Sequence, residues 1–159
     1  MKFLLPLCAM VLVPLSLLAQ SYPQGEVFVA YSGSHGSGFL VAPAYNVNSH
    51  FAIEGDLSSH YKSNPKDDRF HFDVGPRARV HDRDDKAAAF AHFLFGASHV
   101  SLPTVGDTSF SWVLGGGAEY GFDPHWVARL QIDLMRTHFF NNGQNTGRYS
   151  FGLAYRFGR

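Results

Sequence analysis

The chain has 159 residues, a length typical of a single domain. Charged residues make up 16% and aromatic residues 15%, and the 13 basic side chains balance 13 acidic ones. Low charge and many aromatic residues argue against a disordered chain. Because basic residues are not in excess, nothing supports nucleic-acid binding. The single cysteine, Cys8, excludes a disulfide framework.

Residues 1–19 are predicted to form a secretory signal peptide. Lys2 supplies a positive charge, and an uncharged, almost wholly apolar stretch follows over residues 3–19. The alternative is an N-terminal membrane helix, but the stretch contains two prolines and is short for a span. We therefore expect cleavage after residue 19 or 20 and a barrel domain over residues 20–159.

The rest of the chain is predicted to form β-strands, because apolar and polar residues alternate with a period of two. No later stretch approaches the length of an apolar transmembrane helix. The alternation divides into eight segments, of which the first and the fifth are the least regular. In chain order they cover residues 26–32, 39–47, 51–60, 70–80, 87–99, 109–120, 126–134 and 149–157.

The composition of the two faces favours a membrane barrel over a soluble one. One face is rich in Phe, Tyr and Trp, as at Phe72, Leu130 and Phe151, whereas the other mixes small residues with Arg, Asp and Glu. A soluble barrel would bury the apolar face, and the period alone does not separate the two cases. Small and charged residues suit a narrow lumen. We predict an all-β fold, an eight-stranded antiparallel up-and-down transmembrane β-barrel.

The connections between segments are predicted to differ at the two ends of the barrel. Residues 48–50, 82–86 and 123–124 form short turns, whereas the alternate connections look longer. The longer ones cover residues 33–38, 62–69, 101–107 and 139–146. Short periplasmic turns and longer outer loops are typical of outer-membrane barrels. Both termini would then lie at the periplasmic end.

Taken together, residues 25–159 resemble the small eight-stranded outer-membrane barrels of the OmpA/OmpX type, in the outer membrane β-barrel domain group. Beside the alternation, the resemblance lies in residues 114–118, 136–139 and the final Tyr155, Arg156 and Phe157. It implies a monomer in the outer membrane of a Gram-negative cell envelope, in contact with lipid and lipopolysaccharide. It also implies that Tyr155 and Phe157 form a C-terminal signal for the barrel-assembly machinery, although Gly158 and Arg159 follow.

Charged residues on the inward face predict a cluster inside the lumen. Mirror positions across hairpins pair Glu54 with Arg77 and Glu119 with Arg129, and Arg79 lies in the same periplasmic half. Buried charges are costly unless they are paired. Our hypothesis is that these five residues form a plug that closes the lumen. The alternative is that they only stabilise the barrel and select its register.

The histidines and the candidate catalytic residues suggest neither a metal site nor an enzyme. His60, His71 and His92 are predicted to point inward, and His35, His99 and His138 to lie toward the outer end. None forms a tight pair of ligands with a nearby acid, so we expect no metal and no cofactor. The lipid A deacylase family has a Ser two residues after its catalytic His. Here Phe140 follows His138 at that position, so we expect no catalytic residue.

The sequence therefore predicts a small outer-membrane barrel with a structural or surface-interaction role and a lumen filled by side chains. Residues 62–69 are the most charged outer loop and the first candidate for contact with a partner or lipopolysaccharide. The alternatives are a narrow porin-like channel for small solutes and a lipid-modifying hydrolase.

Overall fold

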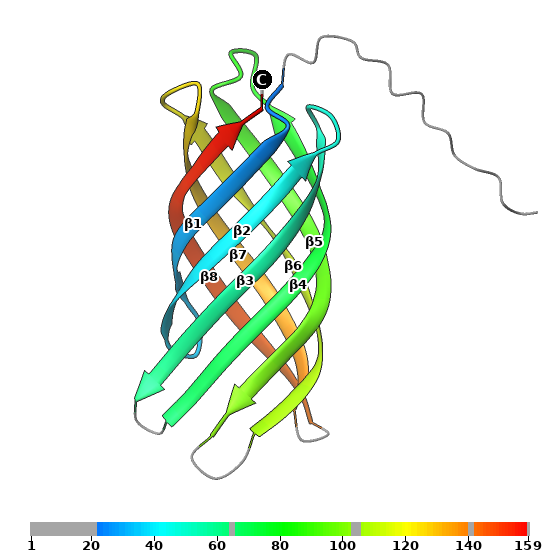
Figure 1. The fold of residues 1–159 in the computed structure, drawn as a ribbon, viewed down its shortest axis with the longest axis vertical. Coiled ribbons are helices and arrows are strands. Elements are labelled where there is room, and N and C mark those ends of the chain that lie inside the picture. The colour runs from blue at the N-terminus through cyan, green and yellow to red at the C-terminus, as the bar shows by residue number, and fades with distance from the viewer. Residues whose placement is uncertain (1–21, 64–65, 103–105, 140–141, 159) are drawn as a thin grey trace, which may run out of the picture.

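A computed structural model describes residues 22–63, 66–102, 106–139 and 142–158, so the predicted signal peptide lies outside the described residues. The described chain forms eight strands in the predicted order (Figure 1). They are β1 (Gly25–Gly33), β2 (Ser37–Asn46), β3 (Phe51–Ser63), β4 (Lys66–His81), β5 (Ala87–Ser101), β6 (Gly106–Gly121), β7 (Trp126–Phe139) and β8 (Asn142–Phe157). No helix among the described residues is long and apolar enough to cross a membrane.

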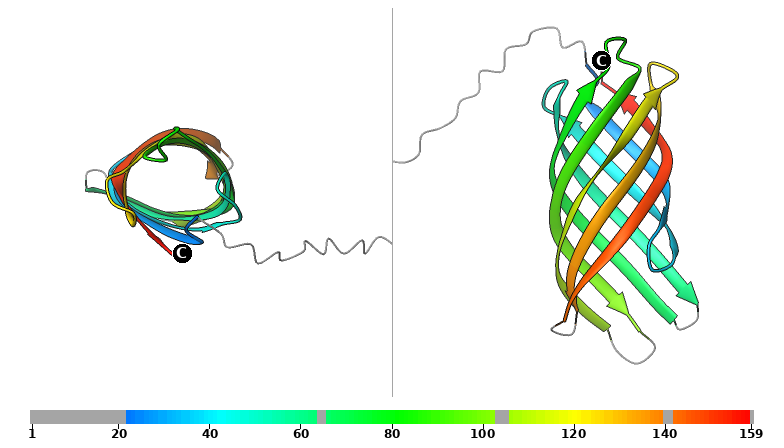
Figure 2. Two further views of the ribbon diagram at one scale, coloured as in Figure 1. Left: turned by 90° about the horizontal axis from the view of Figure 1, so that it is seen from above. Right: turned by 180° about the vertical axis from the view of Figure 1, so that it is seen from behind.

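The strands form one closed antiparallel barrel in which each strand pairs with its neighbours in the sequence. β1 and β8 close the ring, with a ladder that runs from Gly25 opposite Phe157 to Gly33 opposite Tyr149. Seen along the axis, the strands surround a single lumen (Figure 2). Closure gives each described strand a paired neighbour on both sides. The predicted fold class is confirmed.

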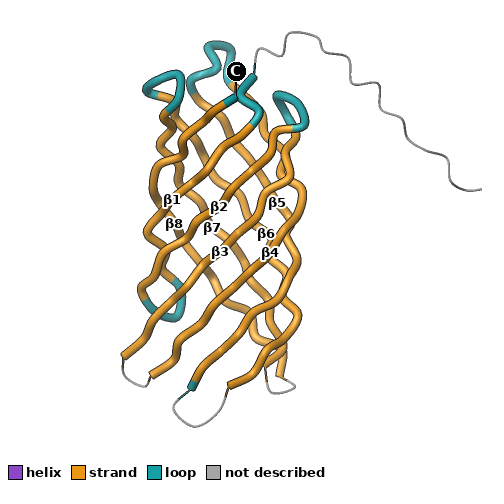
Figure 3. Tube along the Cα trace, viewed as in Figure 1, coloured by secondary structure: helices purple, strands orange, loops and turns teal. Residues whose placement is uncertain are grey.

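The barrel has two distinct ends. Both ends of the described chain lie beside the turns at residues 47–50, 82–86 and 122–125, at the top of Figure 1; we name this the terminal end. The opposite end carries the connections between β1 and β2, β3 and β4, β5 and β6, and β7 and β8, and we name it the loop end (Figure 3).

The predicted difference in loop length is wrong. The β3–β4 ladder continues to Ser63 opposite Lys66, and the β7–β8 ladder continues to Phe139 opposite Asn142. Only residues 64–65 and 140–141 separate these strands. The polar residues that were predicted to form these loops belong to the strands instead. Each ladder satisfies the backbone N–H and C=O groups of both its strands, whatever side chains they carry. The candidate contact segment, residues 62–69, is therefore mostly a paired hairpin.

The side chains face as the sequence predicts. Phe151, Leu130 and Phe72 point outward with 52%, 64% and 50% of their surface exposed. The charged residues between them on the same strands point into the lumen and are buried, as Arg129 and Asp73 are. This arrangement is the inverse of a soluble barrel, in which the apolar face is inside.

Exposed aromatic side chains gather toward both ends of the outer surface. Toward the terminal end they are Tyr45, Phe51, Tyr120, Phe122, Trp126, Tyr155 and Phe157, and toward the loop end Tyr31, Phe39, Tyr61, Phe70, Phe110 and Tyr149. Between them lie aliphatic residues such as Ile53, Leu114 and Ile132. An apolar band with aromatic residues at both margins is the surface of a β-barrel that spans a bilayer.

Candidate functional site

The half of the lumen nearer the terminal end is filled by seven ionised side chains, which we name the terminal charge cluster. β1 contributes Glu26, β3 Glu54, β4 Arg77 and Arg79, β6 Glu119, β7 Arg129 and β8 Arg156. All point inward because each occupies an inward position of its strand, where successive side chains alternate between the faces.

Glu26 is the centre of this cluster. Arg77 donates from Nη1 to Glu26 Oε1 at 2.9 Å and to Glu54 Oε2 at 2.6 Å. Arg129 also pairs with Glu26, and lies 3.3 Å from Glu54 Oε2 and 2.6 Å from Glu119 Oε1. The side chains of Glu26, Arg77 and Arg129 have no exposed surface. The pairing supplies each buried charge with opposite charge and hydrogen bonds.

Two further arginines cover the cluster on the side of the terminal end. Arg79 lies 3.1 Å from Glu26 Oε2 through Nη2 and 3.4 Å from Glu119 Oε2 through Nε. Arg156 reaches the same two oxygens, at 2.9 Å through Nε and 2.7 Å through Nη2. Glu26 and Glu119 are thus held between the inner arginines and this outer pair.

Two aromatic rings pack against Arg129. Its guanidinium carbon lies 4.5 Å from the centre of the Phe28 ring and 4.9 Å from that of Phe90. Such contacts attract the cation to the ring faces and exclude water. Phe28 and Phe90 point inward, which explains why the first and fifth segments alternate least regularly in the sequence.

A second group, the central charge cluster, lies next to the first and consists of His92, Asp133, Arg148 and Asp56. Arg148 donates from Nε to Asp133 Oδ2 at 2.8 Å and from Nη1 to Asp56 Oδ1 at 3.0 Å. Its Nη1 also donates to Ser58 Oγ at 2.8 Å. Arg148 is on β8 and Asp56 on β3, so this pair connects strands that are not neighbours in the barrel wall.

His92 joins the two clusters. Its Nδ1 lies 2.7 Å from Glu54 Oε1 and its Nε2 lies 2.9 Å from Asp133 Oδ1. A neutral imidazole carries one N–H, so two carboxylate partners are both satisfied only by the imidazolium form. Gly115 leaves room for this contact, since a Cβ there would overlap Asp133 Oδ1 and lie 2.7 Å from His92 Nε2.

Nearer the loop end, hydroxyl groups and neutral contacts replace most of the charges. Ser150 donates to Ser32 Oγ at 3.0 Å, and Ser32 Oγ lies 3.0 Å from His60 Nε2. His71 Nδ1 lies 2.5 Å from Ser98 Oγ. His60, His71 and His92 are all buried in the lumen, as predicted. Among the described residues, no group of three or more His, Cys, Asp or Glu is arranged to hold a metal ion.

The structure brings together all five residues of the predicted lumen cluster. Glu119 lies directly opposite Arg129, as the mirror rule predicts. The rule is wrong for the other pair: Glu54 lies opposite Gly75, and Arg77 opposite Ala52. The register differs by two residues from the prediction, and Arg77 reaches Glu54 along a diagonal.

Sequence reasoning missed Glu26, Asp56, Asp133 and Arg148 as members of the network. Asp56 and Asp133 lie on faces correctly predicted to be polar. Asp56 meets Arg148 across the lumen, whereas Asp133 lies directly opposite Arg148 on the neighbouring strand. Arg148 lies one residue before the predicted final strand, residues 149–157, and was therefore not considered as an inward residue. Its alternation with Ser150 and Gly152 was the available signal.

The other predicted residues lie at the outer surface. Tyr155 points outward and packs on Trp126, with ring centres 5.0 Å apart, and Phe157 is the last residue of β8. The backbone N–H of His138 donates to Ser109 Oγ at 3.0 Å, while Phe140 lies outside the described residues. His99 faces Thr108 Oγ1 at 2.7 Å through Nδ1 and Ser101 Oγ at 3.1 Å through Nε2.

Comparison with solved structures shows the fold. Ail of Yersinia pestis superposes with a TM-score of 0.60 at 14% identity, covering 86% of this chain and 99% of Ail. Ail has also been solved with the heparin analogue sucrose octasulfate. The Neisserial surface protein NspA gives 0.57 at 15% identity, covering 86% of this chain and 96% of NspA. The N-terminal barrel of Pseudomonas aeruginosa OprF gives 0.64 at 8% identity, covering 86% and 99%.

No curated protein sequence matches the chain. A family model does, over residues 13–157, and its description is "Outer membrane protein beta-barrel domain". The closed eight-stranded wall, the apolar outer surface and the charged lumen agree with this match. The chain belongs to the outer membrane protein β-barrel domain family, and its location is the outer membrane of the cell.

Proposed function

We propose that this protein is an outer-membrane barrel whose lumen is sealed by the terminal and central charge clusters. The observation that carries the proposal is the set of ion pairs that cross the lumen. Arg129 on β7 contacts Glu54 on β3, and Arg148 on β8 contacts Asp56 on β3. An eight-stranded barrel is just wide enough for its interior to be filled by side chains.

Single-channel recording in planar bilayers tests the seal. The wild-type protein is expected to give no resolved current steps in concentrated KCl. Arg129→Ala removes the side chain that meets Glu26, Glu54 and Glu119, and is expected to produce steps. Arg136→Ala is the matched control, since Arg136 is exposed on the same strand. Wild-type currents as large as those of the Arg129→Ala variant would contradict a closed lumen and favour a narrow porin-like channel.

We propose further that the loop end acts outside the bilayer, in contact with lipopolysaccharide or a surface partner. The 16 residues of β4, at about 3.3 Å each and tilted by about 40°, extend about 40 Å along the axis. The apolar band of such barrels is about 25 Å tall, so strand ends project beyond it. Beyond the aromatic residues of the loop end, exposed polar side chains include Lys62, His99, Arg136 and Asn145.

The binding of Ail to sucrose octasulfate supports anionic sugars as the class of ligand. The test is retention of the full-length protein in nanodiscs on immobilised lipopolysaccharide. Lys62→Glu with Arg136→Glu is expected to reduce retention, because both cations are exposed at the loop end. Lys86→Glu, in a turn at the terminal end, is the control. An equal loss of retention in the Lys86→Glu variant would refute a site at the loop end.

The orientation and assembly follow from the same proposal. The terminal end faces the periplasm, the barrel acts as a monomer, and Tyr155 and Phe157 form the signal for the barrel-assembly machinery. Phe157→Ala is then expected to slow the appearance of the heat-modifiable, folded band in outer membranes. Phe122→Ala, an outward aromatic in a turn at the same end, should leave it unchanged.

We propose no enzymatic role. Both ring nitrogens of His99 face hydroxyl oxygens, which orient the ring less strongly than a carboxylate would. Hydrolysis of phospholipid or lipid A in detergent micelles, lost in Ser101→Ala, would overturn this assignment and favour a lipid-modifying hydrolase.

A further inference from the structure

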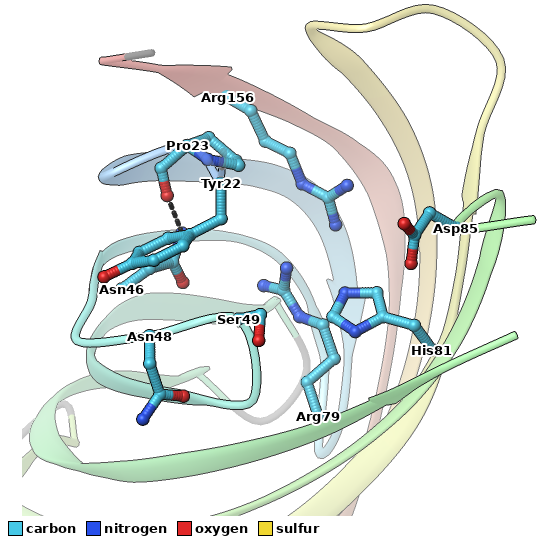
Figure 4. Close-up of a pocket in the computed structure, with 9 residues that line it drawn as sticks. All are labelled: Tyr22, Pro23, Asn46, Asn48, Ser49, Arg79, His81, Asp85 and Arg156. Carbon is cyan, nitrogen blue, oxygen red and sulfur yellow. Dashed lines mark hydrogen bonds between the residues drawn. The ribbon is translucent and has the colours of Figure 1, made fainter. Parts of the chain in front are cut away.

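A pocket of about 170 Å³ opens at the terminal end, next to the terminal charge cluster. Arg79 and His81 enter it from β4, and Arg156 enters from β8 (Figure 4). Ser49, in the turn that follows β2, and Asp85, in the turn that follows β4, also line it. The guanidinium groups of Arg79 and Arg156 point into the same space in this view.

The charge of the cluster is not balanced by its own side chains. It holds four arginines and three glutamates, all joined by ion pairs. One of these glutamates, Glu54, is also a partner of His92, so it is shared with a further cation. A positive charge in a poorly hydrated site is costly without a counterion. The cluster therefore has at least one cation more than its carboxylates match.

The excess charge lies at the pocket. Arg77 and Arg129 have no exposed side-chain surface, whereas Arg79 and Arg156 are 7% and 13% exposed. Both outer arginines contact Glu26 and Glu119 through Nε and Nη2 only. Among the described residues neither Nη1 has a hydrogen-bond acceptor, so donors remain that a bound ligand could use.

We propose that this pocket binds a small oxyanion, a phosphate or carboxylate group, between Arg79 and Arg156. Guanidinium groups present planar pairs of donors that match the oxygens of such groups. A volume of about 170 Å³ equals that of roughly five or six water molecules. The space therefore accommodates a single phosphate group, and the imidazole of His81 supplies a further donor at its wall.

Asp85 limits the affinity. Of the described residues that line the pocket, it alone carries a carboxylate, and its charge opposes that of the ligand. Its backbone has a φ of 53°, a conformation that Asn also tolerates. Asp85→Asn therefore changes the charge of the pocket without straining the turn.

The test is a titration of the full-length, ¹⁵N-labelled protein in maltoside micelles with inorganic phosphate, at constant ionic strength with chloride. The Nε–Hε signals of Arg79 and Arg156 are expected to shift and to saturate, with a Kd that is roughly millimolar. Arg156→Gln should weaken binding about tenfold, since it removes a charged donor. Arg136→Gln, at the loop end, should leave the Kd unchanged.

Asp85→Asn keeps the proposal falsifiable if Arg156→Gln does not fold. It should tighten binding about threefold, as expected when a like charge several ångströms away is removed. Shifts that rise linearly without saturation, an unchanged Kd in Asp85→Asn, or equal weakening in Arg136→Gln would each overturn the proposal.

The same Nε–Hε signals distinguish a soluble anion from the headgroup of a lipid. If the ligand is soluble, phosphate shifts the signals in pure maltoside micelles. If it is a lipid headgroup, the signals move only in micelles that contain phosphatidylglycerol. Either result supports an oxyanion site, and an absence of shifts in both refutes it. Neither result of this titration changes the conductance expected of the wild-type protein. The sealed lumen is therefore tested separately, by single-channel recording.

Discussion

The substitution Arg148→Met isolates the contribution of the central charge cluster to stability. Arg148 is fully buried, and its guanidinium holds Asp133, Asp56 and Ser58 at once. Methionine replaces the aliphatic part of the side chain but has no guanidinium, so the variant leaves two buried carboxylates without their main cation. Breaking a buried ion pair in this way costs about 3–5 kcal/mol, and we expect a loss of that size in the free energy of unfolding.

The measurement is urea-induced unfolding of the protein in lipid vesicles, followed by tryptophan fluorescence. The midpoint should fall with an unchanged m-value, because the surface that unfolding exposes is the same. The double variant Arg148→Met with Asp56→Asn should recover part of the loss, since it removes one uncompensated carboxylate. Arg136→Met, which changes an exposed arginine, is the control.

The reasoning would be refuted by a loss below about 1 kcal/mol in Arg148→Met, the range of exposed ion pairs. It would also be refuted if Asp56→Asn added its full cost to that of Arg148→Met, because residues in one network should couple.

Two other predictions concern the wall of the barrel and use the same unfolding assay. Ile132→Lys places a charge on the lipid face, where Ile132 is 74% exposed. Near the bilayer midplane such a charge is expected to destabilise the barrel by about 2–4 kcal/mol. An unchanged midpoint of unfolding would contradict the placement of this face in the bilayer. Gly115→Ala should destabilise the barrel because its Cβ would displace the Asp133 carboxylate, whereas Gly147→Ala has nothing within 4 Å and should be neutral or slightly stabilising. Equal effects of the two substitutions would show that the close approach at Gly115 is not required.

Strand number and orientation could be predicted from the sequence because both depend on local alternation. In β8, for example, Phe151 and Leu153 differ so clearly from Ser150 and Gly152 that the face toward lipid is evident. The ends of strands could not be predicted in this way. Beyond the bilayer, outward positions such as Asn145 no longer need apolar side chains, so a paired strand has the composition of a loop.

The register and the network across the lumen depend on non-local contacts. No residue marks the centre of the β3–β4 connection strongly enough to separate Glu54 opposite Gly75 from Glu54 opposite Arg77. A rule that pairs neighbouring strands cannot find Glu26 with Arg129, which come from β1 and β7. Such partners become visible only when the curvature of the wall places the strands face to face.

The bonds from β3 to β7 and β8 also impose an order on biogenesis. Glu54 and Asp56 enter early in the chain, but Arg129 and Arg148 arrive only with its last third. In a half-built sheet Arg77 of β4 can already neutralise Glu54, but Asp56 lacks its arginine until β8 supplies Arg148. The charges of the lumen are thus fully paired only when the ring closes, which couples insertion of the first hairpins to delivery of the last.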